Sequence, residues 1–130
     1  MGKFNSIEEI DCWKEGIQLV KHVYRLKQNN TRLQKDFSFV DQIQRAAISI
    51  PSNIAEGFER QSNPEFIRFL FIAKGSCGEV RTQLYIGFEL GYIIKPDFED
   101  LDLLCRKISK MLMGLIIVLR NVKPLNIKTL

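Results

Sequence analysis

Apolar residues recur at alternating steps of four and three across the middle of this chain, and this spacing constrains the fold more than any other feature. The series is Phe66, Leu70, Ala73, Cys77, Val80, Leu84 and Gly87. Such steps place the side chains on one face of an α-helix. Ser62, followed by Pro64 and Glu65, marks a helix start. Gly91 is placed to end the helix in a left-handed conformation. The spacing therefore predicts one long helix that ends at Leu90.

Three further segments show the same periodicity. The first predicted helix begins near Ser6, where Glu9 completes a capping box. The second begins around Ser38, with Asp41 as its reciprocal cap, and the fourth begins around residues 96–97. Their apolar faces are, in chain order, Ile10, Trp13, Ile17, Val20 and Tyr24; Ile43, Ala47, Ile50, Ile54 and Phe58; and Phe98, Leu101, Cys105, Ile108, Leu112, Leu115 and Leu119.

Four helices with short connections pack most simply in an up-down-up-down order. We therefore predict an all-α protein, an antiparallel four-helix bundle. The chain of 130 residues is long enough to bury a core without metals or disulfides. We expect a single domain over residues 1–130, with a core of about 6–120 and a frayed C-terminal tail over 121–130.

The last two predicted helices carry more apolar residues than one buried face needs. The second set is Ile67, Phe71 and Ile72, then Leu104, Met111, Ile117 and Val118. Helices that are apolar on more than one face are buried on more than one side. We therefore predict self-association. The alternative is a wide core face with scattered exposed apolar residues.

The second predicted helix also gathers polar residues on one side, which we call the polar stripe. They are Arg45, Ser49, Ser52, Asn53 and Glu56. The functional interpretation is a contact surface for an anionic or polar partner. In the structural alternative, the charged residues lie in solvent, or the serines and the asparagine satisfy carbonyls freed by Pro51. Pro51 removes the donor for the carbonyl of Ala47 and is expected to kink this helix rather than start a new one.

Composition and charge point to the cytoplasm and permit an anionic partner. The three cysteines are odd in number and widely separated, as is usual in a reducing compartment. The first residues lack the apolar core of a signal peptide, and the longest apolar run, residues 111–119, is too short to span a bilayer. We therefore expect a cytoplasmic protein without a membrane partner. A net charge of +4 permits contact with RNA without requiring it.

The sequence offers little for catalysis. His22 is the only histidine, and no carboxylate stands three or four residues from it, so neither a di-iron nor a zinc site can be built around it. The acidic residues at 97–102 lack the glycine and the terminal glutamate of a calcium loop, and helix N-terminal charge explains them. The glycines form no phosphate-binding loop. We expect no enzyme activity, no cofactor and no metal.

Residues 42–57 have the sequence QIQRAAISIPSNIAEG, which closely resembles a family signature. It is similar to that of the four-helix-bundle proteins encoded in intervening sequences of bacterial 23S ribosomal RNA genes. Further matching residues are Trp13-Lys14, Arg60, Ser62, Glu65-Phe66, Arg68-Phe69-Leu70, Ala73, Gly75-Ser76, Glu79, Thr82-Gln83-Leu84, Leu90-Gly91-Tyr92, Lys110-Met111-Leu112 and Gly114-Leu115. The resemblance covers nearly the whole chain.

The resemblance implies an antiparallel bundle that assembles as a ring-like homopentamer. It also implies kinship with the accessory variability protein of diversity-generating retroelements, a basic barrel that binds RNA and reverse transcriptase. One position departs from the family pattern, because this chain has Gln44-Arg45 where two adjacent arginines are usual. The lost cation weakens any RNA-binding surface that the resemblance implies.

Two functional hypotheses follow. The first is a non-enzymatic homo-oligomer that binds structured RNA or another nucleic acid through pooled basic residues. Its candidate contacts are Lys21, Arg25, Lys27, Arg32, Lys35, Arg45 and Arg68. The second is a scaffold that docks another protein, such as a nucleic-acid-associated one, and uses its charge for solubility. Salt-dependent RNA binding distinguishes the two.

Overall fold

The computed structural model describes residues 4–122, and every regular element in this range is a helix. Four helices are long: α1 (Asp11–Arg25), α3 (Phe37–Glu59), α4 (Asn63–Glu89) and α5 (Lys95–Asn121). Three elements are short: the 3-10 helices η1 (Ile7–Glu9) and η2 (Leu26–Asn29), and the α-helix α2 (Thr31–Lys35). The predicted all-α class is confirmed. The predicted frayed tail falls mainly on residues 123–130, which lie outside the described residues.

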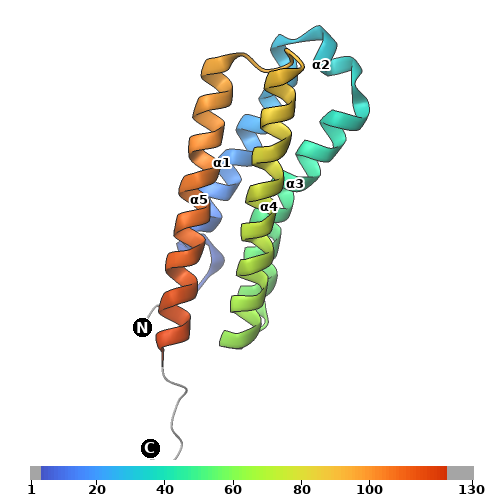
Figure 1. Ribbon diagram of the computed structural model, residues 1–130. Helices are drawn as coiled ribbons and strands as arrows, with labels where there is room; N and C mark the ends of the chain where they lie inside the picture. Colours follow the sequence, from blue (N-terminus) through green and yellow to red (C-terminus); the bar gives the residue numbers. More distant parts are fainter. Residues whose placement is uncertain (1–3, 123–130) are drawn as a thin grey trace, which may run out of the picture.

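The four long helices lie side by side, with α2 at the end where α1 finishes and α3 begins (Figure 1). α3 packs against α4, α4 packs against α5, and α1 packs against both α3 and α5. All four contribute to one hydrophobic core, to which Leu19, Ile50, Leu84 and Ile108 belong. None of the helices between residues 4 and 122 combines the length and apolar character that a membrane crossing requires.

Both predicted ends of α4 are confirmed. The side chain of Ser62 caps the helix by accepting a 3.4 Å hydrogen bond from the backbone N–H of Glu65. At the other end Gly91 has a φ of 77°, in the left-handed region that glycine reaches at low cost. Local capping chemistry therefore fixes where this helix begins and ends.

The predicted start of α3 is wrong by one residue, and the capping residue is a different one. Asp36 precedes the helix, and its Oδ1 accepts a 3.1 Å hydrogen bond from the backbone N–H of Phe39. The helix therefore begins at Phe37, and Asp41 lies inside it rather than capping Ser38. Aspartate is a strong N-cap residue, so Asp36 carried a usable signal that the serine at 38 obscured.

Helix α1 begins later and buries another face than predicted. Ser6 precedes η1 and makes no side-chain capping bond, and α1 starts at Asp11. The buried residues of α1 are Cys12, Gly16, Leu19 and Val23. From the predicted face, Ile10 is buried, Tyr24 is 39% exposed, and Trp13, Ile17 and Val20 are only partly buried. Within α1 the buried residues therefore lie one position before the predicted ones.

Gly16 lies on this buried face where α1 meets α3. A Cβ placed on Gly16 would lie 3.3 Å from Cδ of Pro51, so α1 approaches α3 closely at this point. Pro51 is buried, and α3 continues through it from Phe37 to Glu59. The prediction that Pro51 lies inside one helix is confirmed, and the kink itself stays a prediction.

The short helix α2 lies between the first two predicted helices, where no helix was expected. Asn30 caps it by accepting a 2.9 Å hydrogen bond from the backbone N–H of Leu33. The Leu33 side chain is 1% exposed and anchors the helix to the core. A single buried leucine among polar residues has no periodicity, so the pattern could not reveal this helix.

Candidate functional site

Five of the seven cations predicted to contact nucleic acid lie around one end of the molecule. They are Lys21, Arg25, Lys27, Arg32 and Lys35, and all are exposed. This is the end where α1 finishes and α2 lies (Figure 1). Arg45 lies farther along α3, and Arg68 is in the first turns of α4, at the opposite end of the molecule. The structure thus brings five predicted residues together and leaves Arg68 apart.

Arg32 is occupied by contacts that hold the chain together. Its Nη2 donates a 3.1 Å hydrogen bond to the carbonyl of Leu90, and its guanidinium lies 5.4 Å from the ring centroid of Tyr92. Nearby, Asn30 donates from its side chain to the carbonyl of Gly91 at 3.2 Å. Arg32 therefore ties α2 to the end of α4, and this role competes with ligand binding.

Arg45 and Arg68 have carboxylate partners. Arg45 Nε lies 2.9 Å from Asp41, and Arg68 Nε lies 3.0 Å from Glu65. The hydrogen bond from Arg68 holds the pKa of Glu65 below its usual range. Arg68 also lies over the ring of Phe69, 4.4 Å from its centroid. Among residues 4–122, no ion pair involves the other four candidate cations, Lys21, Arg25, Lys27 and Lys35.

Ser49 of the polar stripe lies at the contact between α3 and α4. Its Oγ donates to the carbonyl of Ala46 at 2.7 Å and lies 2.6 Å from Oγ of Ser76, which is 8% exposed. Ser49 is half-buried, and together with Arg45 it lines one surface hollow.

The remaining stripe residues have local contacts or face solvent. Asn53 Nδ2 donates to the carbonyl of Ser49 at 2.7 Å, and Glu56 pairs with Arg60 at 3.0 Å. The side-chain bonds thus reach the carbonyls of Ala46 and Ser49 rather than that of Ala47, which faces Pro51. Ser52 is exposed. Use of the stripe as a contact surface stays a prediction.

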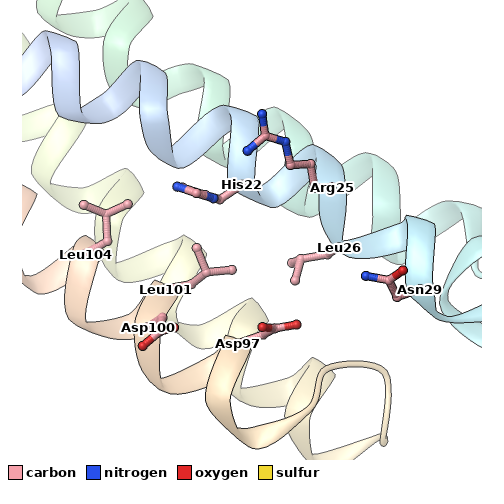
Figure 2. Close-up of a pocket in the computed structure, with 8 residues that line it drawn as sticks. All are labelled: His22, Arg25, Leu26, Asn29, Asp97, Asp100, Leu101 and Leu104. Carbon is pink, nitrogen blue, oxygen red and sulfur yellow. The ribbon is translucent and has the colours of Figure 1, made fainter.

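A cleft of about 370 Å³ opens between the end of α1 and the start of α5 (Figure 2). Its lining residues are His22, Arg25, Leu26, Asn29, Asp97, Asp100, Leu101 and Leu104. The cationic Arg25 therefore comes from α1, and the carboxylates Asp97 and Asp100 come from α5. In the described part of the chain, none of the charged lining residues forms an ion pair.

The sequence did not predict this cleft. The acidic start of α5 was attributed to the helix dipole, and His22 was considered only as a possible metal ligand. His22 and Arg25 stand three residues apart on α1, as do Asp97 and Asp100 on α5. That spacing is the available signal, but only the packing of α1 on α5 shows that the two pairs share a cavity.

A second unusual surface lies on α4 and α5. Four apolar side chains there are 40–47% exposed: Phe71, Ile72, Ile117 and Val118. Three helical glycines are also exposed, and no described atom lies within 4 Å of a Cβ placed on any of them: Gly75, Gly78 and Gly114. We call these seven residues the α4–α5 outer face. Arg120 of α5 lies 5.3 Å from the ring centroid of Phe71, which joins the two helices at this surface.

Part of the second apolar set belongs to the core instead. Ile67, Leu104 and Met111 are partly buried and pack against the core. The surplus of apolar residues is therefore smaller than the sequence suggested, and it is concentrated in the α4–α5 outer face.

An ion-pair network also joins α4 to α5. Asp102 accepts hydrogen bonds from Nε of Arg81 at 2.8 Å and from Nε of Arg106 at 2.9 Å. Burial would raise the pKa of Asp102, but these two hydrogen bonds hold it below its usual range. Within this network, the bond from Arg81 links α4 to α5.

The remaining reactive groups offer little chemistry. All three cysteines are free and buried, and burial raises the pKa of Cys12 to about 11 and that of Cys77 to about 12. Burial also raises the pKa of Cys105. Thiols with such pKa values are weak nucleophiles at neutral pH. Within residues 4–122, no three His, Cys, Asp or Glu side chains are grouped as metal ligands would be.

Residues 4–122 therefore form an all-helical protein with one cleft and one apolar outer face. Residues 8–114 match the model of the 23S rRNA-intervening sequence protein family. The chain belongs to this family, as the resemblance of residues 42–57 predicted.

A solved structure and a search of curated proteins complete the comparison. The chain is similar to a crystal structure of a protein of unknown function from the S23 ribosomal protein family of Bacteroides thetaiotaomicron, with 27% identity and a TM-score of 0.74. That alignment covers 81% of this chain and 97% of the Bacteroides chain. No curated protein matches this chain.

Proposed function

We propose that this chain is a non-enzymatic cytoplasmic module that assembles with copies of itself and binds structured RNA as an assembly. The α4–α5 outer face carries the proposal. Exposed Phe71, Ile72, Ile117 and Val118 lie beside glycines that no other helix within residues 4–122 approaches. Glycine lets two helix backbones come close, and a neighbouring apolar rim then packs well. A second copy of the chain would supply that missing helix.

Within one copy, we propose that the long helices form an antiparallel up-down-up-down bundle. The contacts of α3 with α4 and of α4 with α5 support this order, as does the position of α1 between α3 and α5. The start of α1 and the finish of α5 lie at the same end in Figure 1. This arrangement leaves the outer side of α4 and α5 free for assembly.

We propose a homopentamer, in line with the resemblance that residues 42–57 carry. A ring would bring the basic ends of several copies together. Five chains of +4 each would pool a charge of about +20, enough for binding that releases many counterions. Lys21, Arg25, Lys27 and Lys35 are the best contacts, because they are exposed and have no ion pair among the described residues. The family description also refers to an RNA context.

A protein-interaction scaffold is the second candidate function, and one observation favours it. Carboxylates of the first turns of α5 stand at the same end as the basic residues: Asp97, Glu99 and Asp100. They lower the positive potential that phosphate would meet there. The basic end would then serve solubility, and the outer face or the polar stripe would dock a protein.

The test is fluorescence anisotropy of a labelled, structured RNA titrated with the purified protein at low and at physiological salt. RNA binding through pooled cations predicts at least micromolar affinity that falls steeply as salt rises. Replacing Lys21 and Lys27 by glutamine should reduce both the affinity and the salt slope. A protein that binds no RNA even at low salt would contradict the RNA proposal and leave the scaffold.

A further inference from the structure

The cleft between α1 and α5 combines an apolar interior with polar groups at its margins. Leu101 is buried, and Leu26 and Leu104 are partly buried. In Figure 2, His22 and Leu26 extend from the α1 side toward α5, and Leu104 and Leu101 extend from α5 toward α1. Asp97 and Asn29 stand near the end of the cleft that is closest to the α4–α5 loop. Its volume of about 370 Å³ is within the range of small-ligand pockets, roughly 300–1,000 Å³.

The polar groups restrict which ligand can bind there. Ionised carboxylates such as Asp97 and Asp100 only accept hydrogen bonds, so a ligand must present donors to them. Asn29 both donates and accepts. The leucine side chains require a flat or apolar body between the helices. A phosphate cannot occupy the interior, because the carboxylates would repel it.

Arg25 provides a place for a phosphate outside the interior. It lines the cleft from α1, and its guanidinium points away from α5 (Figure 2). Lys21 is exposed one helical turn earlier on α1. An acceptor-lined interior beside a cationic margin therefore fits a molecule with a donor-rich base and a phosphate.

Guanine fits this description better than the other bases. It carries two adjacent donors, N1–H and the N2 amino group, which one carboxylate can accept together. Adenine and cytosine place a ring acceptor beside their amino group, and uracil has only one ring donor between two carbonyls. Unpaired bases in RNA are commonly recognised on this edge, with the ring held between aromatic or apolar side chains.

We propose that the α1–α5 cleft binds one unpaired guanosine of a structured RNA. Asp97 accepts from the Watson–Crick edge of the base, Leu26 and Leu104 contact its faces, and Arg25 contacts its phosphate. This inference rests on the proposed function, and it names the RNA feature that the module recognises. It also explains why carboxylates stand among the basic residues: they select the base while the cations hold the backbone.

The experiment uses anisotropy with a labelled RNA hairpin whose loop contains a single guanine among uridines. Matched hairpins carry inosine, adenine or an abasic site at that position. Inosine keeps N1–H but lacks the N2 amino group, so it loses one hydrogen bond to a charged acceptor. The affinity of the wild-type protein should fall about tenfold with inosine and further with adenine or the abasic site.

Asp97→Asn should remove most of this base preference. The two oxygens of a carboxylate can accept from N1–H and from the N2 amino group together, whereas an amide has only one acceptor oxygen. Glu99→Gln is the matched control. It removes one negative charge from the same turn of α5, but Glu99 does not line the cleft. Both variants should bind RNA more tightly in general, and only Glu99→Gln should keep the guanine preference. Circular dichroism checks that both fold as the wild type does.

Free guanosine monophosphate, labelled and titrated in the same way, distinguishes the source of the base. If the protein binds all the matched hairpins with the same affinity, the inference is overturned and the proposed RNA function still stands. If the protein binds no RNA but binds the nucleotide, with loss in Asp97→Asn, then the cleft is a guanine site and the RNA function fails. Absence of both binding events would overturn both proposals.

Discussion

Two groups of glycines on the long helices have opposite surroundings. A Cβ on Gly57 would lie 2.7 Å from Cβ of Phe69, and a Cβ on Gly87 would lie 2.7 Å from Cδ1 of Ile93. Gly75, Gly78 and Gly114 would meet no described atom within 4 Å. The first group, which we call the inner glycines, lets parts of one chain approach each other. The second group has no such role inside the chain.

The difference matters because glycine weakens a helix. In the interior of a helix it costs about 1 kcal/mol relative to alanine. At the inner glycines, close packing of Phe69 or Ile93 offsets this cost. Within residues 4–122 the outer glycines have no such compensation, so a neighbouring copy is the natural source of it. On the same helices, the inner glycines therefore serve contacts within one chain, and the outer glycines are placed for contacts between copies.

The largest expected effect is on an inner glycine. Gly57→Ala should lower the free energy of unfolding by about 1–3 kcal/mol, the usual cost of overpacking a core. The new methyl group would clash with Cβ of Phe69 and would lie 3.2 Å from the carbonyl of Phe66, neither of which can move without shifting α4. Chemical denaturation measures the change. An unaltered stability would show that α3 and α4 are less closely packed than described.

The next effect concerns assembly. Ile117→Lys places a charge in the α4–α5 outer face, where Ile117 is 47% exposed, so the single chain should fold normally. Burying an unpaired lysine between copies is costly, and the assembly should dissociate. Light scattering measures the mass, and Lys110→Gln is the control because Lys110 is an exposed residue of α5 that does not belong to the outer face. An unchanged assembly would place the interface elsewhere.

A smaller effect distinguishes the outer glycines from the inner ones. In the Ile117→Lys background, Gly78→Ala should raise the free energy of unfolding by up to about 1 kcal/mol, because alanine favours the helix and meets open space. In the wild-type background the same change should weaken assembly. Chemical denaturation of the wild type and of Ile117→Lys, each with and without Gly78→Ala, forms a double-mutant cycle. Equal gains in both backgrounds would mean that no helix covers Gly78.

The smallest effect tests the pH dependence of the contacts near Gly87. The backbone N–H of Tyr92 donates to the carbonyl of Gly87 at 2.8 Å, and the Tyr92 hydroxyl donates to Oδ2 of Asp36 at 2.8 Å. The hydrogen bond from Tyr92 lowers the pKa of Asp36, and the same bond raises the pKa of Tyr92.

The two shifts act at opposite ends of the pH scale. A carboxyl with a depressed pKa stabilises the fold above its unfolded pKa, and this stability is lost as pH falls through the native pKa. A tyrosine with a raised pKa stabilises the fold below its unfolded pKa, and this stability is lost as pH rises through the native pKa. Tyr92→Phe should therefore be slightly less stable than wild type at neutral pH, with the difference shrinking toward both extremes. Thermal melts across pH measure it, and a constant difference would exclude the pair as its cause.

Sequence patterns predicted the helices that carry long apolar series and clear caps. The all-α class, the extent of α4 and the left-handed Gly91 followed from spacing and local chemistry alone. The start of α1, its buried face and the helix α2 did not. They depend on Gly16 approaching Pro51 and on one buried side chain, Leu33, which are tertiary contacts with no local period.

The surfaces were predicted less well than the fold. The sequence indicated exposed apolar residues on the last two helices, and Phe71 and Ile117 bear this out. It could not show that Ser49 meets Ser76, or that Asp97 and Arg25 line one cleft, because residues far apart in the chain supply each site. Only the packing of the helices brings such residues together.

Sedimentation equilibrium of the wild-type protein tests the central claim most directly. We expect a mass several times that of the 15.1 kDa chain, and five times that mass for the proposed pentamer. We also expect a return toward 15.1 kDa for Ile117→Lys with the helical content unchanged. A wild-type mass of one chain at concentrations well above micromolar would contradict assembly through the α4–α5 outer face.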